Sequence, residues 1–100
     1  MRIIAKRTLR LFWETHPRGA EARVPLQLWH STVARKDWAT PSDVKAIYGD
    51  ASILKNSRVV FNIGGNKYRL VARINYPFRT VFIRFIGTHE EYDDIDAETI

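Results

Sequence analysis

The hydrophobic pattern of this chain changes once, near its middle, and that change limits the folds it can adopt. Before Gly49 the apolar residues recur at helical intervals of three and four, and from Arg58 onward they alternate with a period of two. Helical spacing predicts amphipathic helices, whereas alternation predicts half-buried strands. Helices grouped before a run of strands indicate an α+β domain whose helices cover one face of a sheet.

The helical half predicts a short strand followed by two or three helices. The segment 2–5 is short and β-branched, which suits a strand, and a first helix should follow it and end before Pro17. A second helix should begin at Ala20 or at Pro25, because Pro25 fits either a first helical turn or a kink. Thr40 is expected to cap a third, short helix.

The alternating half predicts a three-stranded antiparallel meander. Strands are expected over 58–63, 67–76 and 80–87, with turns at Gly64-Gly65-Asn66 and Pro77-Phe78-Arg79. The N-terminal strand would make this sheet mixed. We expect residues 1–100 to form one small domain, with helices on one sheet face and the other face free to bind. The alternation alone leaves the strand register open.

Charge is distributed unevenly along the chain. All sixteen Lys and Arg residues lie at or before Arg84, and six of the eleven acids lie in the last eleven residues. Between Ala51 and His89 there are seven cations and no carboxylate. Such a segment favours a polyanionic ligand, most commonly nucleic acid, over a basic surface that only aids solubility. The acidic tail is either solvated or folds back onto the basic face.

Several function classes are disfavoured by what the sequence lacks. Without cysteine there are no disulfides and no thiolate chemistry, so a reducing cytoplasm is the expected location. No apolar run is long enough for a signal sequence or a membrane span. His16, His30 and His89 have no metal-site spacing, and no phosphate-binding glycine motif occurs. We therefore expect no metal and no cofactor.

Basic side chains follow two adjacent predicted strands. Lys67, Arg69 and Arg73 recur on one side of the 67–76 strand, and Arg84 comes from its neighbour. Cations crowded together without local acids favour a phosphate-binding face. The residues expected to contact RNA through this face are Lys55, Arg58, Arg73 and Arg84.

His89 and Tyr92 lie just beyond the last predicted strand. If Thr88 caps a helical turn, their side chains project from the same side. An imidazole and a phenol beside guanidinium groups suit RNA phosphodiester cleavage, in which a base deprotonates the 2′-hydroxyl and cations stabilise the phosphorane. The alternatives are a surface histidine that bonds locally and a tyrosine ring that packs over the sheet edge.

Two segments, "SILKNSRVVFNIGGNKYRLVARINY" and "VFIRFIGTHEEYDDID", resemble the HigB toxins of the RelE-like superfamily, bacterial type II toxin-antitoxin mRNA interferases. The resemblance implies a RelE-like fold whose basic concave face enters the ribosomal A site. There it would cleave mRNA by metal-independent 2′-hydroxyl attack and inhibit translation. It also implies a HigA-like helix-turn-helix antitoxin as partner, contact with operator DNA only through that antitoxin, and no membrane partner.

The resemblance also suggests roles for single residues. Arg69 matches the phosphate-stabilising arginine of the family's "YRL" strand, and His89 matches a position that relatives use for an acid or an electrostatic helper. The general base stays open between Lys67 and His89, with Tyr92 stacking on a base or orienting the nucleotide. A lysine base would need a depressed pKa, which crowding by Arg69 and Arg73 would supply.

Two competing functions use the same surface. The first is a non-catalytic RNA-binding or ribosome-associated module, in which the basic face gives affinity alone. The second is an inert protein that keeps a toxin fold and binds only an acidic antitoxin segment.

Overall fold

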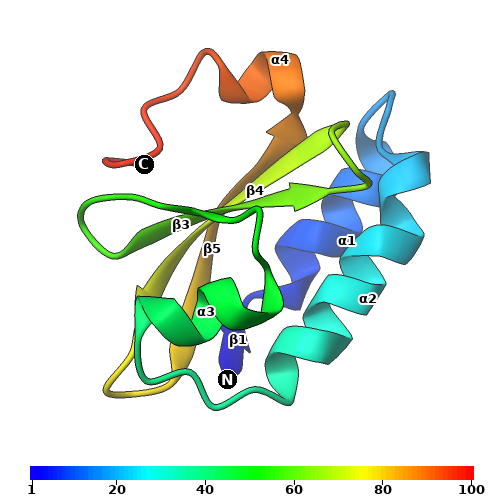
Figure 1. The fold of residues 1–100 in the computed structure, drawn as a ribbon. Helices are drawn as coiled ribbons and strands as arrows, with labels where there is room; N and C mark the ends of the chain where they lie inside the picture. The colour runs from blue at the N-terminus through cyan, green and yellow to red at the C-terminus, as the bar shows by residue number, and fades with distance from the viewer.

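The computed structural model describes residues 1–100, which form one five-stranded sheet with helices packed against it (Figure 1). The elements in chain order are β1 (Arg2–Ile4), α1 (Lys6–Thr15), the 3₁₀ turn η1 (Ala20–Ala22), α2 (Arg23–Ala34), α3 (Pro41–Ile47), β2 (Ser52–Ile53), β3 (Arg58–Ile63), β4 (Tyr68–Asn75), β5 (Thr80–Thr88) and α4 (His89–Tyr92). None of the helices has the length and apolar character that crossing a membrane requires.

The strand order is β1-β5-β4-β3-β2. β3, β4 and β5 form the antiparallel meander that the alternation predicts, and β1 pairs parallel to β5. The α+β class and the mixed N-terminal strand are thereby confirmed. The two-residue edge strand β2, antiparallel to β3, was not predicted. Its exposed Ser and Ile give too short a pattern to detect.

The helix boundaries follow local chemistry. The turn η1 leads directly into α2, so Pro25 lies in the first turn of α2, where its missing N–H costs nothing. Thr40 caps α3 as predicted: its hydroxyl accepts a hydrogen bond from the Asp43 amide, and the Asp43 carboxylate accepts from the Thr40 amide. This reciprocal pair satisfies two of the helix's free donors.

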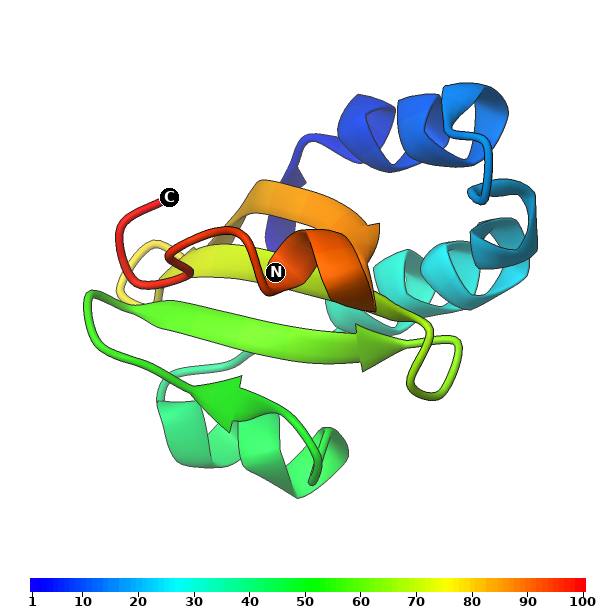
Figure 2. The same cartoon turned by 90° about the horizontal axis from the view of Figure 1, so that it is seen from above.

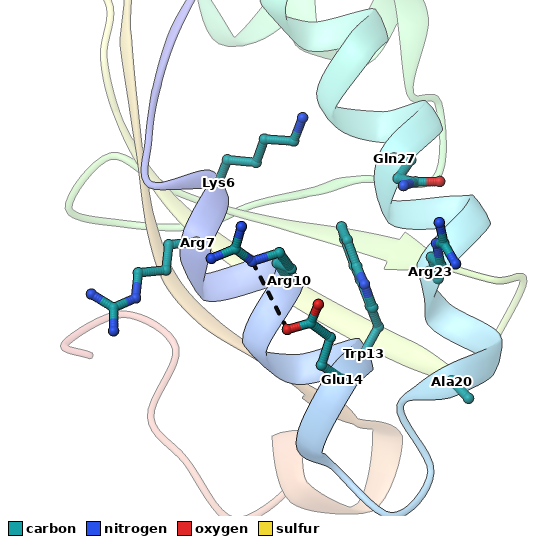
Figure 3. A pocket seen from close by; sticks show the side chains of 8 residues that line it. All are labelled: Lys6, Arg7, Arg10, Trp13, Glu14, Ala20, Arg23 and Gln27. Carbon is teal, nitrogen blue, oxygen red and sulfur yellow. Dashed lines mark ion pairs between the residues drawn. The ribbon is translucent and has the colours of Figure 1, made fainter.

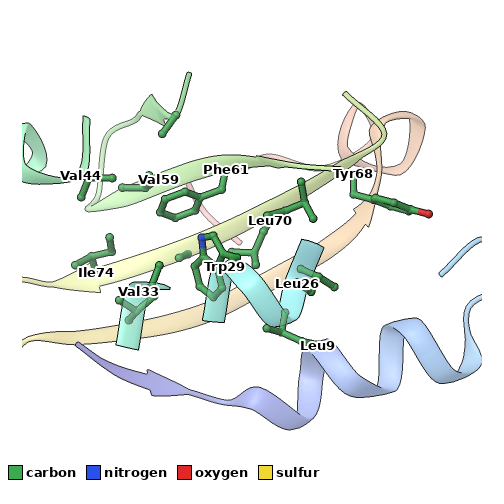
Figure 4. Close-up of a cluster of buried hydrophobic side chains, with 14 of the residues drawn as sticks. Leu9, Leu26, Trp29, Val33, Val44, Val59, Phe61, Tyr68, Leu70 and Ile74 are labelled. Atoms are coloured by element: carbon green, nitrogen blue, oxygen red, sulfur yellow. The ribbon is translucent and has the colours of Figure 1, made fainter. Parts of the chain in front are cut away.

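α1 and α2 lie side by side against the sheet (Figures 1 and 2), and the core fills the space between them and the strands. Trp29 of α2 meets Phe61 of β3 edge-to-face, with ring centroids 5.3 Å apart. Leu9 and Leu70 are fully buried in the same cluster (Figure 4). Truncating one of these buried leucines to alanine typically costs about 2–5 kcal/mol, so this layer sets the position of β4.

Strict alternation along the last strand was expected, and it is wrong at one position. Val71 pairs with Phe85 but its neighbour Ala72 pairs with Ile83, so Arg84 is an extra residue in a β-bulge. Beyond the bulge Phe85 packs on the face opposite the helices, while Ile86 packs toward the core.

The sheet face opposite the helices is not free, contrary to expectation. The C-terminal segment folds back over it, and buried Ala97 joins Val60 and Val71 in a small apolar cluster. The Arg58 guanidinium donates to the Ile100 backbone oxygen at 2.5 and 3.1 Å. The acidic tail is therefore an intramolecular partner of the basic strands, one of the two alternatives left open by the sequence.

Candidate active site

The β3–β4 turn begins the site. Gly64 and Gly65 both have positive φ, 62° and 69°, a backbone region that favours glycine. The turn includes Lys67, because β4 begins only at Tyr68, so the prediction that Lys67 belongs to the strand is wrong. The ammonium group of Lys67 thus projects from a loop at the end of the sheet.

Helix α4 supplies the imidazole at the same end. Thr88 caps this helix: its hydroxyl accepts from the Glu91 amide at 3.2 Å, and its own amide donates to Glu91 Oε1 at 2.8 Å. The His89 amide donates to the Lys67 carbonyl at 3.1 Å, which joins α4 to the turn. Gly87 leaves room for the Phe85 ring and the Glu91 carboxylate, since a Cβ there would lie 2.5 Å from the ring and 3.0 Å from Glu91 Oε1.

Lys67 and His89 border one cleft of about 550 Å³, which we call the His89 cleft. It lies between the α1–η1 loop, the β3–β4 turn and the start of α4. Its lining residues are Pro17, Arg18, Ala20, Glu21, Asn66, Lys67, Tyr68, Thr88, His89 and Glu90. The sequence predicts guanidinium and ammonium groups from two neighbouring strands beside this imidazole. Of those cations only Lys67 lines the cleft with His89, while Arg69, Arg73 and Arg84 do not.

The cations of this cleft are paired with carboxylates. Lys67 Nζ lies 2.7 Å from Glu21 Oε2, and Arg18 Nη2 lies 3.1 Å from Glu90 Oε2. The hydrogen bond and charge of Glu21 raise the pKa of Lys67, and those of Lys67 lower the pKa of Glu21. The expectation of a depressed lysine pKa is therefore wrong, because Glu21, distant in sequence, faces the ammonium group. A protonated Lys67 suits charge stabilisation and not proton abstraction.

His89 keeps one open side. Its side chain is 43% exposed, and Nδ1 lies 3.4 Å from Asp93 Oδ2, one helical turn further on. A carboxylate beside one ring nitrogen orients the imidazole. The other nitrogen is left for a ligand in the cleft.

Arg69 lies on β4 next to this end of the sheet, but it is almost fully buried. Its guanidinium donates to the Asn66 carbonyl at 3.3 Å, the Asn66 side-chain oxygen at 2.6 Å and the Tyr68 carbonyl at 3.2 Å. These bonds hold the β3–β4 turn that carries Lys67. In this arrangement Arg69 positions the cleft and does not line it.

Tyr92 does not share the His89 cleft, contrary to the prediction that both side chains project together. Its ring packs against the apolar cluster of Val60, Val71 and Ala97, beside the C-terminal segment. Tyr92 is only one helical turn from His89. Its ring nevertheless packs on the sheet face, because burying an aromatic surface is favourable. The packing alternative raised for Tyr92 is the one observed.

The other predicted RNA-binding residues gather farther along the sheet. Arg58 pairs with Arg73 across β3 and β4, and Arg73 lies 6.0 Å from the Phe82 ring centre. Burial, together with the nearby Arg84 and Arg73, lowers the pKa of Arg58. Arg58, Arg73 and Arg84 thus form a trio of guanidinium groups. Lys55 lies next to the tail, where its amide donates to Glu98 at 3.2 Å.

Sequence reasoning missed the residues that frame the cleft from the N-terminal half. His16 Nε2 lies 3.1 Å from Glu91 Oε2, while its Nδ1 accepts from the Arg18 amide at 3.0 Å. That pattern fixes the tautomer with the proton on Nε2. The Thr88 amide, and then His16, lower the pKa of Glu91. The T-x-x-E spacing of a capping box was readable at Thr88 and Glu91, but nothing in the sequence links that box to His16.

The mixed sheet backed by helices is consistent with the small RelE-like fold, and the imidazole and paired cations lie at one end of that sheet. The family model described as "HigB_toxin, RelE-like toxic component of a toxin-antitoxin system" matches residues 22–95. The chain belongs to this HigB toxin family.

Individual relatives match over almost the whole chain. The mRNA interferase toxin HigB of Escherichia coli strain K12 is 30% identical over 99 residues, covering 97% of this chain and 92% of the relative. The mRNA interferase HigB of Shigella flexneri gives the same values. The mRNA interferase HigB of Escherichia coli O6:H1 is 28% identical, covering 95% and 91%.

Proposed function

We propose that this chain is the toxin of a type II toxin-antitoxin system and cleaves mRNA on the ribosome, which inhibits translation. The observation that carries the proposal is the meeting of His89 and Lys67 in one open cleft at the end of a basic sheet. The relatives named mRNA interferases support the same activity. The protein would act in the cytoplasm and be held inactive by a HigA-like helix-turn-helix antitoxin, which alone would contact operator DNA.

The proposed reaction is a metal-independent transesterification. A base takes the proton of the ribose 2′-hydroxyl, the 2′-oxygen bonds to phosphorus, and the bond to the 5′-oxygen breaks as that oxygen takes up a proton. The products are a 2′,3′-cyclic phosphate and a new 5′-hydroxyl end. His89 is assigned to proton transfer, since it is the one imidazole of the cleft and its ring is half exposed.

Lys67 is assigned to the charge that builds on the phosphorane. Its raised pKa keeps the ammonium group protonated, and its flexible stem sits on the rim beside His89. A phosphate entering the cleft competes with Glu21 for Lys67 and with Glu90 for Arg18. Arg69 is assigned a positioning role, because its side-chain hydrogen bonds go to Asn66 of the turn that carries Lys67 and to the adjoining Tyr68 carbonyl.

The decisive experiment combines growth arrest with transcript-end mapping. Expression of the wild-type chain without antitoxin should stop growth and create new mRNA 5′ ends, and His89→Ala should abolish both. His30→Gln is the matched control, because His30 lies on α2 and does not line the cleft. A toxic His89→Ala variant would refute the assignment of His89.

The same experiment tests the non-catalytic alternative. One observation favours that alternative: of the four residues predicted to be catalytic, only Lys67 and His89 line the cleft. A pure RNA-binding module would arrest growth without creating new 5′ ends. An inert partner protein would do neither.

A further inference from the structure

A second hollow lies on the helical side of the molecule, between α1 and α2 (Figure 3). Its volume is about 710 Å³, and we call it the interhelical groove. Lys6 and Arg10 form one wall on α1, Arg23 and Gln27 lie on α2, and Trp13 stands between the two helices. Lys6, Arg10 and Trp13 share one helix face because they are four and three residues apart.

The charge of this groove is almost entirely unpaired. Four cations line it, and its one carboxylate, Glu14, lies 3.9 Å from Arg10 in an exposed pair. Such exposed pairs are weak. Lys6, Arg7 and Arg23 form no ion pair. Burial and then the charge of Lys6 lower the pKa of His30 on α2.

Trp13 gives the groove a stacking surface. Trp29 and Trp38 are 2% exposed and belong to the core, whereas Trp13 is only partly buried and lines the groove. Cationic walls with an aromatic ring between them match the way proteins bind single-stranded nucleic acid: the cations follow the phosphates and bases stack on the ring. An acidic peptide would use the cations but gain less from the indole.

The groove meets the His89 cleft at one residue. Ala20, at the start of η1, lines both hollows. From these observations we propose that the interhelical groove binds a single-stranded stretch of RNA continuous with the nucleotide held in the His89 cleft. This inference rests on the proposed function, because it makes the groove a second contact surface for the same RNA substrate.

Binding of a non-cleavable probe tests the proposal. The probe is a fluorescein-labelled 2′-O-methyl RNA of about 12 nucleotides, compared with one of about 4. Arg10→Gln/Arg23→Gln removes one cation from each wall, and Arg2→Gln/Arg35→Gln removes the same charge from exposed positions outside both hollows. Circular dichroism melts verify that each variant is folded.

The groove variant should bind the longer probe about tenfold more weakly at low salt, while the control changes much less. For this variant, the slope of log affinity against log salt concentration should become shallower by about 1.4, which is about 0.7 for each lost phosphate contact. The advantage of the longer probe should disappear. Arg10→Glu/Arg23→Glu should weaken binding by about a hundredfold.

Trp13 adds an optical readout. Because Trp29 and Trp38 are buried, RNA binding should quench tryptophan emission through Trp13, and Trp13→Phe should remove the quenching. Groove and control variants that bind equally would overturn the proposal. So would a groove that binds an oligoglutamate peptide but not RNA, since the occupant would then be an acidic protein segment. Cleavage by the wild-type chain is scored separately by transcript-end mapping, so failure of cleavage and failure of the groove are distinguishable.

Discussion

The His89 cleft and the interhelical groove adjoin at Ala20, yet they differ in how their cations are balanced. In the cleft, Lys67 and Arg18 each face a carboxylate at close range, whereas in the groove Lys6 and Arg23 face none. Cations that are paired with carboxylates are held in position and exchange partners only with a ligand that fits the site. Unpaired cations attract any polyanion. In the two proposals, the cleft performs chemistry and the groove supplies affinity.

The largest expected difference between the His89 cleft and the interhelical groove is in how their variants change kcat and KM for an RNA substrate. Lys67→Gln is expected to lower kcat about tenfold or more with KM little changed, because the charge acts on the phosphorane. Arg23→Gln should instead raise KM with kcat preserved, because it removes uniform binding. If both variants altered the same parameter, the assignment of catalysis to the cleft and of binding to the groove would be wrong.

The position of the cleft residues should depend on the cap of α4. Thr88→Ala removes the hydroxyl that accepts from the Glu91 amide and should cost about 1 kcal/mol of unfolding free energy, measured by urea denaturation. Activity should fall with it, whereas probe binding in the groove should not. Thr88→Ser, which keeps the hydroxyl, is the control and should behave as wild type.

Removing a carboxylate from the cleft should make it behave more like the groove. Glu21→Gln leaves Lys67 unpaired, so a short RNA probe should bind about threefold more tightly. Asp94→Asn makes the same charge change on the exposed tail and should have a smaller effect. An unchanged affinity in Glu21→Gln would mean that the ion pair does not compete with RNA.

The smallest effect should appear in the pH dependence of stability. The pKa values of Glu21, Glu90 and Glu91 are lowered from 4.5, so their stabilisation is complete above about pH 4.5 and is lost as the pH falls through the folded-state values. Thermal melts between pH 6 and 3 should show this loss, and Glu91→Gln should remove part of it. A flat profile in wild type would contradict the pairing.

Much of the fold could be predicted because local pattern and packing agree. The cap at Thr40, the glycine turn and the alternation in β3 and β4 each specify backbone geometry within a few residues. The bulge at Arg84 could not be predicted, since it depends on register with Val71 across the sheet. The covering of the second face by the tail was only one of two options, because charge attraction alone does not say whether an acidic segment packs.

The site was predictable in its residue types but not in its pairings. The pKa of Lys67 is set by Glu21, which is 46 positions away, and the sequence offers no sign of that contact. The buried state of Arg69 depends on Asn66, a turn residue chosen for backbone conformation as much as for hydrogen bonding. Tyr92 was misplaced because the apolar cluster that holds it forms only when the tail folds back.

Ala20, which lines both the interhelical groove and the His89 cleft, has only a methyl side chain. A bulky aromatic substitution there would wall off one hollow from the other without altering any charge. Such a variant would still bind RNA in the groove and keep His89 in the cleft. Binding in the groove and cleavage in the cleft would, however, no longer act on the same RNA strand.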